Sequence, residues 1–217
     1  MDQKRDFGHI KVKAFLSDFD GTLVKKDLLD VVCGIVGKED ESKALNLEFQ
    51  SGRRKGLGAL IDRINLLHGV SISQIHSKIA ENDFLKPGTK KLFDYLKKEK
   101  IVTILYSGNL EAILDYYQKK LNISYVVGTK PNMKGEVIES ISEDNFEEKQ
   151  FKLNKIQQIL GSNRINSNEV VALGDSSGDE AIFEYAGTSI AIDPKGGIEK
   201  KANYIVNSLR EVIDLLK

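Results

Sequence analysis

The sequence has 217 residues, of which 41% are apolar and 29% charged, a composition typical of a globular protein and not of a disordered one. Lys and Arg total 32, as do Asp and Glu, so the zero net charge gives no reason to expect nucleic acid or an anionic membrane as partner. The single cysteine, Cys33, excludes an internal disulfide, and we found no apolar run of membrane-spanning length or signal-peptide core, so we expect a cytoplasmic protein.

The first predicted element is a strand at residues 12–19, VKAFLSDF. It is followed by residues 24–84, which show helical patterns only. About sixty helical residues exceed any ordinary connection between a strand and a helix. We therefore predict an inserted helical cap over residues 24–84, with the α/β core formed by residues 1–23 and 85–217.

Strands and helices alternate through the rest of the chain. We predict further strands at 101–107, 124–129, 169–175 and 188–193, helices at 88–100, 110–121 and 150–161, the last ending at Gly161, and a small hairpin within 130–141. Near-continuous apolar strands that alternate with helices require a parallel sheet covered on both faces. The predicted fold class is therefore α/β, a Rossmann-like doubly wound parallel sheet with an all-helical cap.

Acidic residues follow two of the predicted strands. Asp18 and Asp20 end the first strand in DFDGT, and side chains at i and i+2 of a strand face the same side. Asp175 and Asp179 follow a later strand in ALGDSSGD. Two acidic clusters at one sheet edge, where ligands bind in open α/β sheets, need a cation, and oxygen ligands favour Mg²⁺. The alternative for the second cluster is helix capping and turn formation, which are common after strands.

The segment ILYSGNLEA supplies a third element of the site. Ser107 ends an apolar strand, followed by Gly108 and by a helix starting near Asn109, whose N-terminus would suit phosphate oxygens. Alternatively, Ser107 only caps that helix. A permanent cation is also needed, and the candidates, each of which is otherwise a surface residue, are Lys149, Lys152 and Lys155.

Together these residues resemble the haloacid dehalogenase superfamily, whose phosphatases share an Asp-x-Asp-Gly-Thr strand end. The helical insert directly after this motif is similar to the subgroup with a type I cap, and the spacing is most similar to the phosphoserine phosphatases. The resemblance implies that Asp18 is the nucleophile, and that Asp20 is the general acid/base and a metal ligand through its backbone carbonyl. It further implies that Asp18 and Asp175 bind Mg²⁺ with support from Asp179. Phosphate would be bound by Ser107, Gly108, Asn109 and Thr22, and Thr22 would also steady Asp20. Lys152 would be the active-site lysine, with Lys149 as the second choice.

The implied activity is a Mg²⁺-dependent phosphomonoester hydrolase that acts through an aspartyl-phosphate. To protonate the leaving group, Asp20 needs a pKa raised by burial and by Asp18. In the cap, Asp27 would meet the amine and Arg63 the carboxylate of L-phosphoserine. Alternatively, Asp27 only caps a helix and Arg63 is a surface residue. Gly178 in place of asparagine, and aspartate in place of glutamate at position 27, depart from the phosphoserine phosphatase pattern.

Other functions remain open on the sequence. The partner we expect is a small phosphorylated metabolite, and one other than phosphoserine is the first alternative. A different class is a receiver-like module with a phosphorylated aspartate, or a non-catalytic binding protein on the same fold; the second acid at Asp20 and the large cap argue against a receiver. The chain is either a monomer or a homodimer.

Overall fold

The computed structural model describes residues 11–146 and 151–217. In this part of the chain the main element is a six-stranded, all-parallel sheet with the order β3-β2-β1-β6-β7-β8. The strands are β1 (Ala14–Ser17), β2 (Val102–Leu110), β3 (Tyr125–Thr129), β6 (Val170–Gly174), β7 (Thr188–Ile192) and β8 (Tyr204–Val206). Every predicted strand is present. The additional strand β8 is a three-residue edge strand, too short to show a periodic pattern in the sequence.

The strand order places a crevice beside β1. The chain builds one half of the sheet through β2 and β3, then returns to the other side of β1 for β6, β7 and β8. Such a reversal opens a crevice beyond the carboxyl ends of the strands where the direction changes. Ser17 at the end of β1 is in register with Leu105 of β2 and Leu173 of β6. The residues that follow these three positions therefore reach the same edge of the sheet.

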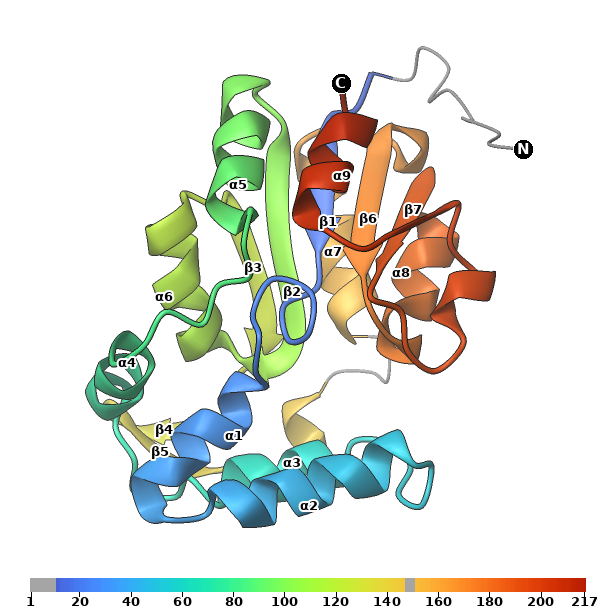
Figure 1. Cartoon of the computed structure of the whole chain (residues 1–217). Helices are drawn as coiled ribbons and strands as arrows, with labels where there is room; N and C mark the ends of the chain where they lie inside the picture. The colour runs from blue at the N-terminus through green and yellow to red at the C-terminus, as the bar shows by residue number, and fades with distance from the viewer. Residues whose placement is uncertain (1–10, 147–150) are drawn as a thin grey trace.

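Helices cover both faces of the sheet (Figure 1). Residues of α5 (Thr89–Lys98), α6 (Glu111–Leu121) and α9 (Leu209–Leu215) share one apolar cluster, and those of α7 (Phe151–Ser162) and α8 (Glu180–Tyr185) share another. Successive residues of β1 alternate between the two: Phe15 belongs to the first cluster and Leu16 to the second. The prediction of a doubly wound α/β fold is confirmed.

The region after β1 is helical, as predicted. It contains α1 (Leu28–Cys33), α2 (Glu39–Gln50), α3 (Gly58–Asn65) and α4 (Ile72–Ala80), which lie beyond the carboxyl ends of the strands (Figure 1). The segments that enter and leave it pair with each other: Lys25 N–H donates to Phe84 O at 2.9 Å, and Lys86 N–H to Leu23 O at 2.8 Å. The boundaries of a cap domain at residues 24–84 stay a prediction.

The predicted hairpin is present as β4 (Asn132–Lys134) and β5 (Val137–Ser140), and it lies against the cap. Gly69 N–H donates to Ile138 O, and Ile138 N–H donates to Val70 O, both at 2.9 Å. Ile72 N–H also donates to Glu136 O at 2.9 Å. Backbone pairing thus joins this hairpin, distant in sequence, to the segment between α3 and α4.

Several helix ends differ by one or two residues from the prediction, and α5 ends at Lys98 and not at residue 100. Helix α7 continues past Gly161 to Ser162, and the left-handed residue beyond it is Arg164, with φ 56°; its predicted start at residue 150 lies outside the described residues. Helix α6 begins at Glu111, not near Asn109, because β2 extends to Leu110. In the described ranges, no helix has the length and apolar character needed to cross a bilayer.

Candidate active site

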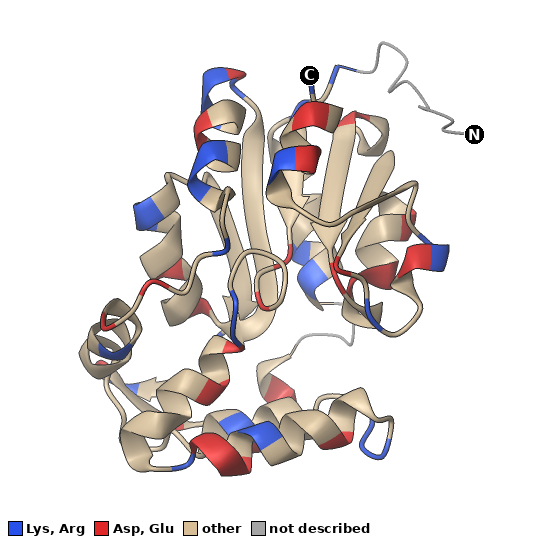
Figure 2. Ribbon diagram, in the orientation of Figure 1, with Lys and Arg blue, Asp and Glu red and all other residues tan. Residues whose placement is uncertain are grey.

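The polar residues predicted from the strand ends meet in one place. Asp18 follows β1 and donates its backbone N–H to Leu173 O of β6 at 2.9 Å, so that Asp175 lies beside it. Both side chains are buried, as is Ser107 in the C-terminal half of the neighbouring β2. In Figure 2 the acidic colour marks the ends of β1 and β6, next to the basic colour of α7. The prediction that these strand ends converge is confirmed by the geometry.

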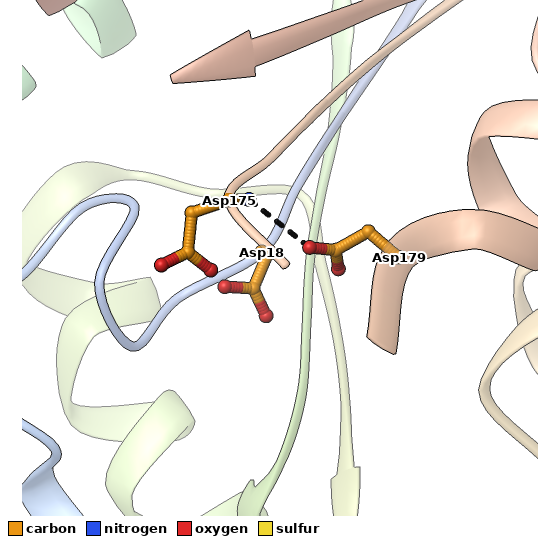
Figure 3. Close-up of side chains that lie close together, drawn as sticks. All are labelled: Asp18, Asp175 and Asp179. Carbon is orange, nitrogen blue, oxygen red and sulfur yellow. Dashed lines mark hydrogen bonds between the residues drawn. The ribbon is translucent and has the colours of Figure 1, made fainter. Parts of the chain in front are cut away.

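Three of the aspartates form a tight acidic cluster, Asp18, Asp175 and Asp179 (Figure 3). Each offers a carboxylate oxygen, and these oxygens lie within 4.8 Å of one another. Asp179 is oriented by the first turn after β6, because one of its oxygens accepts the backbone N–H groups of Asp175 and Ser176 at 3.1 Å. The carboxylate of Asp20 lies outside the cluster.

The electrostatics of the acidic cluster fit a divalent cation. Burial, and next the charge of Asp179, raise the pKa of Asp18 well above its usual range. Burial also raises the pKa of Asp179. Buried carboxylates at this spacing are costly when ionised unless a cation joins them, and an all-oxygen donor set suits Mg²⁺. The residues present therefore fit the predicted metal.

Lys152, from the first turn of α7, is the predicted cation that reaches this cluster. Its Nζ lies 3.3 Å from the backbone oxygen of Gly178 and 5.5 Å from the centroid of the Tyr106 ring. Its charge lowers the pKa values of Asp18 and Asp179, against the larger effect of burial. Lys152 thus offsets part of the negative charge at the site.

A second lysine at the cluster was not predicted. Lys195 Nζ pairs with Asp175 Oδ2 at 3.0 Å, and its backbone N–H donates to Asp175 O at 2.7 Å. It lies on the loop after β7, where Asp193, Gly196 and Gly197 have positive φ, and no sequence spacing indicates that such a loop returns to β6. Of the other two candidates, Lys149 lies outside the described residues, and Lys155 lines a different pocket from that of Lys152.

Asp20 is held separately, by three donors. Leu28 N–H donates to one oxygen at 2.9 Å, and Ser107 Oγ and Asn109 Nδ2 donate to the other at 3.2 and 3.0 Å. Burial, and next the charge of Asp27, raise the pKa of Asp20 to about 7. The predicted direction agrees, but the neighbouring charge responsible is that of Asp27 in the cap, not that of the adjacent acid on the strand.

Thr22 contacts a different acid from the one predicted. Its buried hydroxyl donates to Asp18 Oδ2 at 3.2 Å and not to Asp20. The turn from Phe19 to Val24 brings this about, because the backbone N–H groups of Thr22 and Leu23 return to Phe19 O. Thr22 therefore orients the first acid of the motif.

The C-terminal end of β2, residues 107–110, makes hydrogen bonds within itself. Asn109 N–H donates to Ser107 Oγ at 3.0 Å, and Leu110 N–H donates to Asn109 Oδ1 at 2.8 Å. The hydroxyl of Thr129 on β3 holds Gly108 O at 2.7 Å. The side chains of Ser107 and Asn109 thus face Asp20, and phosphate binding by residues 107–109 stays a prediction.

In the cap, Arg63 is buried and pairs with two aspartates. Its Nη2 lies 2.7 Å from Asp27 Oδ1 and 2.9 Å from Asp30 Oδ1, and its Nε donates to Ser42 Oγ at 2.9 Å. Arg63 is therefore not a surface residue. Asp27 also caps α1 by accepting backbone N–H groups of that helix, so capping and pairing occur together. Asn46, which donates to Asp27 Oδ2 at 3.0 Å, was not predicted.

One cavity of about 260 Å³ connects the two halves of the site. The predicted residues that line it are Asp18, Asp20, Asp27, Arg63, Ser107, Gly108, Asn109, Lys152 and Asp179. Thr22 and Asp175 are absent from its lining; Thr22 donates to Asp18, and Asp175 lies beside Asp18 in the acidic cluster. The cavity lies between the strand ends and the cap, so a molecule inside it contacts acids, a cation and the cap together.

Comparison with known proteins gives a consistent result. The family model described as haloacid dehalogenase-like hydrolase matches residues 15–184. The sequence is 28% identical to a phosphoserine phosphatase of Methanocaldococcus jannaschii over 95% of this chain and 99% of that one, and 24% identical to one of Lactococcus lactis over 92% of each. A substrate-bound phosphoserine phosphatase structure, 25% identical, superposes with a TM-score of 0.80 over 95% of this chain and 99% of that one. A phospho-aspartyl intermediate analogue of a phosphoserine phosphatase, also 25% identical, gives 0.79 over 95% and 100%.

Proposed function

We propose that this chain, which belongs to the haloacid dehalogenase-like hydrolase family, hydrolyses phosphomonoesters with Asp18 as the nucleophile. The observation that carries the proposal is the single cavity that brings Asp18, Asp20, Ser107 and Lys152 together under the cap. Each of the two acids of the DFDGT motif has its own set of hydrogen bonds there, as two separate roles require.

The residues divide the work as follows. An oxygen of Asp18, oriented by the Thr22 hydroxyl, attacks the phosphorus in line and forms the P–O bond of an aspartyl-phosphate as the ester P–O bond breaks. Asp20 gives its proton to the departing alkoxide oxygen; a pKa of about 7 suits this task at neutral pH. Water then attacks the phosphorus, its proton passes to Asp20, and Asp18 leaves as the carboxylate with release of phosphate.

A metal would be held by Asp18 and Asp175, with Asp179 in support and the backbone carbonyl of Asp20 as a further oxygen donor. Bound Mg²⁺ supplies positive charge that lets an anionic phosphoryl group approach buried carboxylates. Lys152 adds a permanent positive charge on the side of α7.

The favoured substrate is L-phosphoserine, and another small phosphorylated metabolite is the alternative. The named relatives and the substrate-bound structure support phosphoserine, and so does the opposite charge of Asp27 and Arg63 in the cavity. The amine of phosphoserine would pair with Asp27 in place of Arg63. The Arg63 guanidinium would then turn to the carboxylate of the substrate.

Hydrolysis of p-nitrophenyl phosphate and of a panel of phosphorylated metabolites with Mg²⁺ tests the proposal. We expect turnover that is abolished by a metal chelator and by Asp18→Asn, with Asp62→Asn on the cap surface as the matched control that keeps activity. Full turnover in Asp18→Asn would refute the nucleophile. Phosphorylation of Asp18 by acetyl phosphate without ester hydrolysis would indicate a receiver-like module.

A further inference from the structure

On the cap side, two rows of side chains, hereafter called stripes, line the cavity, one on α2 and one on α3. Residues three apart on a helix share a face. On α2 this places Asn46 beside Phe49, and at the start of α3 it places Leu57 beside Leu60, with Arg63 one turn further along. All five line the cavity, and α2 and α3 lie side by side in Figure 1. Each stripe therefore has a polar end and an apolar end.

The polar end is satisfied within the protein. Asp27 Oδ1 accepts the backbone N–H groups of Leu29 and Asp30 and pairs with Arg63, and its Oδ2 accepts from Asn46. Both oxygens of the acid are thus engaged. All of these contacts are with residues of the cap.

The apolar end consists of Phe49, Leu57 and Leu60, hereafter the apolar wall. Phe49 is 48% exposed, and the other two are partly buried. Leu60 Cδ2 lies 3.6 Å from the point where a Cβ on Gly108 would stand, so the wall reaches the end of β2 that is predicted to bind phosphate. At the outer end Gly56 is exposed, and apart from its chain neighbours no described atom lies within 4 Å of such a point on it.

The space beside the wall is large enough for a hydrocarbon group. The cavity volume is about 260 Å³. An engineered apolar cavity of about 150 Å³ takes up benzene. A ring or a short alkyl chain therefore fits together with the phosphoryl group to which it is attached.

We propose that the apolar wall is a substrate subsite that takes the hydrocarbon part of an alkyl or aryl phosphomonoester. The proposal rests on the proposed phosphomonoesterase activity and adds the chemical class of its organic group. An apolar group that lies on Phe49 and Leu60 leaves water, whereas the Asp27–Arg63 pair does not need to open. Such esters are then bound without the cost of breaking a buried ion pair.

The value of kcat/KM along a series of n-alkyl phosphates, from ethyl to hexyl, tests this subsite. Burying one methylene group fully raises kcat/KM about fourfold. Against a half-exposed wall we therefore expect kcat/KM to rise about twofold per added methylene in the unmodified protein. Phe49→Ser should reduce the gain in kcat/KM per added methylene toward onefold.

Leu47→Ser is the matched control, because Leu47 is on the same helix and 58% exposed but does not line the cavity. It should keep the full increment. A flat series in the unmodified protein, or equal effects of the Leu47 and Phe49 variants, would overturn the subsite while ethyl phosphate and phosphoserine were still hydrolysed. Failure to hydrolyse any ester would overturn the proposed function as well.

Discussion

Replacing Arg63 by alanine tests whether the buried ion pairs hold the cap together. The Arg63 side chain is 8% exposed and lies between Asp27 and Asp30, whose side chains are 23% and 11% exposed. The substitution leaves both carboxylates without their cation, and Ser42 loses a donor as well. The stability of the cap, and not only substrate binding, should therefore fall.

The cost follows from the burial of the pair. Removing one partner of a buried ion pair costs about 3–5 kcal/mol, and we expect about 3 because Asp27 is partly solvated. For a chain of this size, that loss lowers the melting temperature by about 6–12 °C. Arg54→Ala is the matched control: Arg54 pairs with Glu48 and Asp62 at the cap surface, where an ion pair contributes less than about 1 kcal/mol.

The loss should also depend on pH, through Asp30. Burial, and next the charge of Asp27, raise the pKa of Asp30 above its ordinary value of 3.8, and Arg63 acts in the opposite direction. A carboxyl group whose pKa is raised by folding costs stability as the pH rises from the ordinary value through the raised one. Without Arg63 that window extends to higher pH, so the stability deficit of Arg63→Ala should be larger at pH 8 than at pH 5.

Urea denaturation at both pH values, followed by circular dichroism, measures the deficit. Adding Asp30→Asn to Arg63→Ala should recover at least about 1 kcal/mol, because the residues are in contact and their effects do not add. A deficit below about 1 kcal/mol that is equal at pH 5 and pH 8 would refute the structural role of the pair.

Three further substitutions concern the acidic cluster. Thr22→Val removes the hydroxyl that orients the nucleophile, so kcat for p-nitrophenyl phosphate should fall about tenfold with KM nearly unchanged, and an unchanged kcat would contradict that role. Gly21→Ala places a Cβ against the Asp175 carboxylate, at a φ of 85°, and should weaken Mg²⁺ binding in a calorimetric titration. The control is Gly52→Ala, at a φ of 72° with no described atom beyond its chain neighbours within 4 Å, which should lower the stability of the fold without changing Mg²⁺ binding. Lys195→Met removes the ammonium paired with Asp175, so the same titration should show tighter Mg²⁺ binding, and weaker binding would show that the lysine supports the site.

The sequence was sufficient for the parts of the site that parallel strands determine. Asp18 and Asp175 each follow a buried strand and Ser107 lies in the C-terminal half of β2, and adjacent parallel strands end at the same edge. Their convergence needs no knowledge of loop conformation. The fold class followed in the same way, from apolar strands that alternate with helices.

Contacts made by turns and loops could not be predicted from spacing. Thr22 was expected to support Asp20, but the tight turn after Phe19 directs its hydroxyl to Asp18. Lys195 reaches the site from a loop whose path depends on left-handed residues, which the sequence does not specify. Local conformation, and not residue type, decides both contacts.

In the cap, one available signal was overlooked. Asp27 is the N-cap of α1 and Asp30 lies in its first turn, and the other residues of this helix are apolar or Cys33, so the two acids lie close together and need a cation. Arg63 was assigned to a substrate carboxylate without asking which charges within the cap it would neutralise. A count of charges on buried helical faces would have indicated the pairing.

The backbone pairing between the hairpin and the cap has a consequence for protein engineering. Ile138 exchanges hydrogen bonds with Gly69 and Val70, and Asn65 binds both backbone groups of Ile141 at 2.9 and 3.0 Å. A chimera that transplants residues 24–84 alone onto another scaffold would leave these groups unmatched. Exchange of caps between such proteins should therefore move residues 132–141 together with the helices, as a two-segment module.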